Sequence, residues 1–149
     1  MARLGEIICD KIATMIAAIT TPAIKVVHRN PFGSADINSM PCAFVWLESA
    51  NGIKLHRADD KKRWEFIIGV AIVATSKSST SGDITATLDG FRAAVEDKLD
   101  SDRTLTGTCE YADAEEWSYV YEPGGDGAGM VCMASTTVMA LKQAGRQAN

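Results

Sequence analysis

Cysteine and histidine are the residue types in this sequence best suited to nucleophilic catalysis or to zinc binding. Zinc sites are usually built from pairs of such residues roughly three to five positions apart, because that spacing brings two ligands side by side. The histidines and cysteines of this chain are scattered, at Cys9, His28, Cys42, His56, Cys109 and Cys132. We therefore expect no metal site and no cofactor.

The surroundings of the four cysteines indicate a structural role. Each stands in or near an apolar segment, where thiols are typically buried and unreactive. We expect reduced thiols and no disulfide, as in a cytosolic protein. A cysteine and a histidine could still meet through space, because catalytic groups are recognised by geometry and not by sequence order. A small thiol enzyme is thus one alternative, which a single hyperreactive cysteine would reveal.

A glycine-rich segment at 124–129 could be taken for a phosphate-binding loop. Such a loop opens a helix, so that backbone N–H groups and the helix dipole meet the anion. Here a strand is expected to follow, and the Gly-Lys-Ser/Thr ending of a phosphate loop is absent. We interpret the segment as the connection of a hairpin, although a ligand-binding module remains a further alternative.

Two groups of carboxylates, Asp59-Asp60 and Asp113-x-Glu115-Glu116, could bind a cation or act as a general acid and base. Polar residues flank both groups, which favours a solvated surface. The short basic cluster Lys61-Lys62-Arg63 could contact DNA, but the formal net charge of the whole chain is −4. Acidic proteins repel nucleic acid, so surface ion pairs are the simpler interpretation.

Length and composition indicate one domain with a true core. The chain has 149 residues, of which 46% are hydrophobic. A domain of this size buries roughly 68–70% of the surface that its unfolded chain exposes. We expect residues 1–141 to form the domain and residues 142–149 to form a polar, frayed tail. The sequence has no apolar run of the roughly 18 residues that span a membrane, and Glu6 and Asp10 interrupt any signal peptide.

Periodicity predicts two helices. Apolar residues recur every three or four positions over 3–19, and Ile84, Leu88, Phe91, Val95 and Leu99 do the same. Strands are expected at 24–28, 42–49, 53–56, 64–74, 106–111, 117–121 and 130–141. Of these, Trp64–Ala74 is apolar on both faces and is therefore expected at the centre of the sheet.

Turn signals separate these elements. Asn51-Gly52 is typical of a type I′ hairpin turn, since both central residues of that turn need positive φ. The segment Thr75–Gly82 is almost entirely Ser and Thr, and we expect a mobile loop there. Together the elements predict an α+β fold, with a largely antiparallel or mixed β-sheet and two main helices packed on one face.

The order of elements resembles that of the tail-terminator (tail completion) proteins of long-tailed bacteriophages. The resemblance covers nearly the full length, as loose patterns without a catalytic signature. The segments that carry it are the N-terminal helix, the strand entry at 41–45, the strand at 63–74, the helix at 91–99, the turn Asp102-Arg103-Thr104-Leu105-Thr106-Gly107 and the final hairpin at 117–141.

The resemblance implies a structural virion protein of the tail or neck, assembled in the host cytoplasm, and not an enzyme. It implies a ring of the chain itself, most simply a hexamer, that caps the tail tube protein and ends its polymerisation. The opposite side of the ring would meet the head-side connector or head-closure protein. Phage DNA would pass through the lumen without specific binding, and no membrane is involved. Another neck or minor tail component is the nearest alternative.

Opposite charges in separate segments suggest how such a ring is held together. A head-to-tail interface needs two unlike, complementary patches on one subunit. We hypothesise contacts between a basic and an acidic segment of neighbouring copies, with Lys77 of the polar loop available to a partner. Pairing of the two segments within one subunit, or plain exposure to water, is the alternative. The residues concerned are Arg57, Lys61, Lys62, Arg63, Lys77, Asp113, Glu115 and Glu116.

Overall fold

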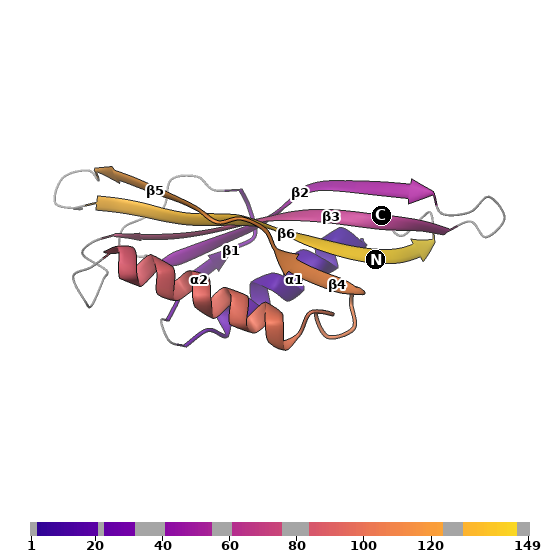
Figure 1. Cartoon of the computed structure of the whole chain (residues 1–149), viewed down its shortest axis with the longest axis horizontal. Coiled ribbons are helices and arrows are strands. Elements are labelled where there is room, and N and C mark those ends of the chain that lie inside the picture. The colour runs from indigo at the N-terminus through magenta and orange to yellow at the C-terminus, as the bar shows by residue number, and fades with distance from the viewer. Residues whose placement is uncertain are drawn as a thin grey trace.

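The computed structural model describes residues 3–20, 23–31, 41–54, 61–75, 84–123 and 130–145. Within these ranges the chain forms two helices and a six-stranded sheet, so the predicted α+β class is confirmed (Figure 1). The elements are α1 (Leu4–Ala17), β1 (Val26–His28), β2 (Cys42–Lys54), β3 (Lys61–Thr75), α2 (Ile84–Ser101), β4 (Tyr111–Ala114), β5 (Ser118–Pro123) and β6 (Met130–Gly145).

The sheet has the order β1-β2-β3-β6-β4, and β5 pairs with β6 along the same edge as β4. All pairings are antiparallel except that of β1 with β2, which is parallel. β3 lies between the two longest partners, β2 and β6. The central position predicted for the strand at 64–74 is therefore confirmed, and its two-sided apolar pattern is the physical reason.

Both helices lie on one face of the sheet, as predicted (Figure 1). α1 buries Ile8, Ile12 and Ile16, and α2 buries Phe91, Val95 and Leu99 in the same core. Burying each of these side chains contributes roughly 1.5–3 kcal/mol. The sheet meets the helices with alternate residues of its strands, among them Ala43, Val45, Phe66, Ile68, Val70, Ile72, Val138 and Ala140.

The hairpin predicted at Asn51-Gly52 is wrong. β2 continues through both residues, which pair with Glu65 and Trp64 of β3. The register shifts between Leu47 and Ser49, as in a β-bulge, and the pairing then runs on to the end of β2. Continuous pairing with a long partner outweighs a two-residue turn preference. The segment Lys61–Arg63, expected in a surface stretch, correspondingly belongs to β3.

The strand predicted at 106–111 is also wrong, because turns occupy this segment up to Tyr111. Leu105 and Thr106 adopt φ of 50° and 61°, and Gly107 follows at 79°. The Asp102 carboxylate accepts hydrogen bonds from the Thr106 N–H at 2.8 Å and from its hydroxyl at 3.1 Å. These bonds, together with burial of the Leu105 side chain, hold a backbone that β-branched residues rarely adopt.

Three further expectations concern segment ends. β6 extends to Gly145 and pairs there with Lys61, so the end predicted at Leu141 is four residues short. Thr75 belongs to β3, and the rest of the predicted loop, 76–82, lies outside the described residues. Neither described helix is long and apolar enough to cross a membrane.

Candidate assembly surface

The face of the sheet opposite the helices is called the second face. Strand residues point alternately to the two sides, so the second face carries the residues that the helix-side core leaves out. It has an apolar cluster of its own, made of Cys42, Phe44, Ala71 and Val73, with Trp46, Val131 and Met133 packed against it. No described helix covers this face.

Exposed apolar side chains occur at separate places on the second face. Among the described residues, four large hydrophobic side chains are exposed, and three of them, Val26, Tyr111 and Val120, lie on this side. Their exposed fractions are 38%, 43% and 40%. The fourth, Tyr121, is 41% exposed and points to the helix side of β5. An apolar surface shared by several strands is typical of a protein-interaction site.

Trp46 shapes the middle of the second face. Its indole lies over Gly69 of β3, and a Cβ atom at Gly69 would overlap the ring. The indole N–H donates a hydrogen bond to Glu48 Oε2 at 2.6 Å. Beside the ring, small residues of β6, Ser135 and Thr137, leave a shallow hollow of about 390 Å³ that reaches Glu116.

The acidic segment lies where β4 ends. Arg103 Nη1 is 3.2 Å from Asp113 Oδ1 and donates a hydrogen bond to the Tyr111 hydroxyl at 2.9 Å. The Arg103 guanidinium carbon is 5.1 Å from the centre of the Tyr111 ring. Asp113 therefore has a cationic partner within its own chain, which sequence reasoning missed. Glu115 and Glu116 follow in the exposed link to β5.

The acidic segment lies beside the middle of β6, whereas Lys61–Arg63 of the basic segment lie beside its C-terminal end. Arg63 is exposed on the second face and pairs in register with Gln143, whereas the Glu115 N–H bonds to the Thr137 carbonyl. Six residues of strand separate these two levels, or roughly 20 Å. The register therefore keeps Arg63 apart from Glu115 within one chain. Lys61 and Lys62 lie in β3 with side chains outside the described set, and Arg57 and Lys77 lie outside the described residues altogether.

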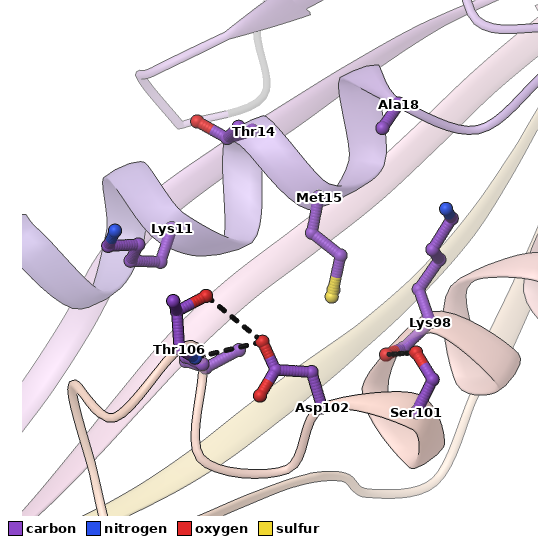
Figure 2. A pocket seen from close by; sticks show the side chains of 9 residues that line it. Lys11, Thr14, Met15, Ala18, Lys98, Ser101, Asp102 and Thr106 are labelled. Carbon is purple, nitrogen blue, oxygen red and sulfur yellow. Dashed lines mark hydrogen bonds between the residues drawn. The ribbon is translucent and has the colours of Figure 1, made fainter.

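A second hollow, of about 310 Å³, lies between the two helices (Figure 2). Met15 points into it, while the ammonium groups of Lys11 and Lys98 lie at opposite ends. The hydrogen bonds from Thr106 lower the pKa of the Asp102 carboxyl, so this group serves the turn that it holds. The polar groups do not converge on one point, as a catalytic or anion-binding site would require.

The cysteines have the buried surroundings that their sequence context predicts. All four are free thiols in the interior. Burial raises the pKa of Cys109 to about 11, and at Cys9 it raises the pKa despite the nearby Arg29 guanidinium. His28 stacks on Phe44 with ring centres 4.9 Å apart. Within the described ranges, no three His, Cys, Asp or Glu side chains come together as metal ligands would.

The sequence of β6 contains a pattern that corresponds to the apolar part of the second face, but the pattern can be interpreted only with the structure. Val131, Met133, Met139 and Leu141 alternate with the buried residues of β6, so both ends of this stretch are apolar on both sides, while Ser135 and Thr137 make its middle polar on the second face. Such a pattern predicts burial on two faces but does not say whether this chain or another supplies the cover.

Comparisons with known proteins add no relative. No protein-family model matches the sequence, and no curated protein matches it either.

Proposed function

We propose that this chain is a structural subunit of a bacteriophage tail, which forms a ring on the end of the tail tube and stops tube growth. The ring would then join the tube to the head-side connector in the virion. The observation that carries the proposal is the second face, which exposes Val26, Tyr111 and Val120 and which neither described helix covers. The order of elements resembles that of tail-terminator proteins, and this resemblance is the reason for proposing a phage tail ring as the assembly.

The chemistry of the chain favours assembly over catalysis. Burial raises the pKa values of Cys9, Cys109 and Cys132, so little nucleophilic thiolate forms at these residues near neutral pH. An apolar centre with charges around it is the usual composition of a protein interface.

The charge of the chain is compatible with passage of DNA through a ring. A net charge of −4 provides no general field that would hold phosphate groups. DNA would therefore move through the lumen without sticking to it. The same negative net charge argues against a specific DNA-binding role.

Two neighbouring residues of β5 provide a matched test of the second face. Val120 and Tyr121 are about equally exposed but point to opposite sides of the sheet. We expect Val120→Lys to abolish arrest of tube growth, because a charge would have to be desolvated in the interface. Tyr121→Lys should leave arrest intact. The measurement is the length distribution of tubes grown from purified tube protein with each variant present.

Circular dichroism and thermal unfolding provide the control, since both substitutions are at exposed positions and should leave the fold unchanged. Equal arrest by the two folded variants would contradict the proposal. So would loss of arrest with Tyr121→Lys alone, because it would place the functional surface on the helix side.

A further inference from the structure

We infer that a small pocket on the second face receives the Arg63 side chain of a second copy of this chain. The inference rests on the proposed function, since it names a contact that would hold neighbouring subunits together. It goes beyond the pairing of charged segments by assigning one pocket and one inserted residue.

The pocket combines an apolar floor with an acidic rim. It has a volume of about 180 Å³. Met139 and Leu141 of β6 contribute to its lining, as do Tyr111, Asp113 and Glu115 from β4 and the link that follows. An arginine side chain has an apolar stem, which suits the floor of the pocket, and a charged guanidinium group, which suits the acidic rim.

The chain already shows that this site attracts a guanidinium group. Arg103 packs against the Tyr111 ring and pairs with Asp113 at its edge. Arg103 also pairs with Asp100, so its charge is shared between two carboxylates. Glu115 remains on the rim, and the bond from its N–H to the Thr137 carbonyl, 2.8 Å long, fixes its backbone. A second guanidinium would therefore be directed to Glu115.

The inserted residue belongs to a basic end of the sheet that extends past the helices. The ends of β2 and β6 and the start of β3 run on beyond α1 and α2 (Figure 1). Lys54 at the end of β2 and Lys61, Lys62 and Arg63 at the start of β3 are all basic. Residues 100–116 hold six acidic and one basic, a balance of −5. The two regions are therefore electrostatically complementary.

Any direct pairing of Arg63 with the acidic rim is between copies. Asp113 lies opposite Met139, and Arg63 lies opposite Gln143. Met139 and Gln143 are four residues apart along β6, or roughly 13 Å, and Glu115 lies farther from Arg63 than Asp113 does. An arginine does not reach the acidic rim of its own chain across that separation. Because the two unlike patches lie at different places on one copy, they can make a head-to-tail contact, and repetition of that contact can close a ring.

Charge exchange tests the contact. Arg63→Glu or Glu115→Lys alone should weaken self-association about tenfold or more at low salt, with a smaller effect at high salt. The double variant Arg63→Glu/Glu115→Lys should associate like the original chain, and so should a mixture of the two single variants. Arg63→Lys should associate more weakly than the original chain but more strongly than Arg63→Glu, because lysine keeps the charge and the apolar stem and lacks the planar guanidinium. Lys11→Glu, which makes the same charge change on the helix side, should have no effect.

Analytical ultracentrifugation measures these associations. Single variants that associate like the original chain, or a double variant no better than either single one, would overturn the inference. If rings form and stop tube growth without sensitivity to these charges, the inference fails and the proposed function stands.

A second readout does not depend on ring formation. Carbodiimide treatment of mixed light and heavy-isotope copies should join Lys61 or Lys62 of one copy to Glu115 of another. Absence of this cross-link in concentrated protein would overturn the inference, whatever the chain does with tubes. A closed two-fold dimer containing both contacts would also overturn it, because head-to-tail contacts do not end at two copies.

Discussion

Gly69 allows the Trp46 indole to lie flat on the second face. A Cβ atom there would overlap the ring, so any larger residue must displace it. Trp46 also holds Glu48 through its indole N–H. One missing side chain on β3 thus sets the position of a large aromatic residue on β2, next to the hollow that reaches Glu116.

Gly69→Ala should therefore destabilise the fold, although alanine is ordinarily better than glycine in a strand by about 0.5–1 kcal/mol. Overpacking costs about 1–3 kcal/mol, which outweighs that gain. In a Trp46→Leu background the same substitution should cost much less, because the ring that it displaces is gone. Urea unfolding of the four proteins measures the coupling. Equal costs of Gly69→Ala in both backgrounds would show that the indole does not occupy this position.

At the scale of elements, β2 shows that strand pairing can override the turn preference of a short sequence such as Asn51-Gly52. Asn51 lies within the strand opposite Glu65, without the positive φ that a type I′ turn would impose. Asn51→Thr should thus leave the free energy of unfolding unchanged or raise it by up to about 1 kcal/mol, since β-branched residues favour strands. In a type I′ turn, threonine would cost roughly 1–2 kcal/mol. Urea unfolding distinguishes the two cases, and a loss larger than 1 kcal/mol would contradict the continuous strand.

The sequence was sufficient to predict the elements whose apolar pattern extends over many residues. The helix stripes through Ile8 and Phe91 and the two-sided pattern of β3 need no tertiary information, because period and length identify them. Short signals were less informative. The turn at Asn51 was overridden by pairing, and the segment before Tyr111 is shaped by the Asp102 carboxylate, which no periodicity reveals.

The candidate surface was predictable only in part. Arg63, Glu115 and Glu116 were found from the sequence because charge clusters are visible there. The apolar pocket was missed, since it depends on the register that brings Tyr111 opposite Leu141. The partnership of Asp113 with Arg103 was missed for the same reason: these residues meet only after the turn folds.

At the scale of the whole molecule, the two faces of the sheet differ: the helices cover one face, and no described helix covers the other. The helix side buries a continuous core, while the second face exposes apolar residues and also carries a basic strand end and an acidic segment. Burial of exposed apolar area drives association, and charge complementarity sets its orientation and rate. Both features are typical of a subunit whose exposed apolar surface is buried by neighbouring subunits.

The central claim is that copies of this chain close a ring on the end of a tail tube. Electron microscopy of tubes grown from purified tube protein, with and without this chain, tests it most directly. We predict a ring-shaped density at one end of each tube and an arrest of elongation that increases with the concentration of the chain. Tubes of unchanged length with bare ends, while the folded chain remains monomeric in solution, would contradict the account.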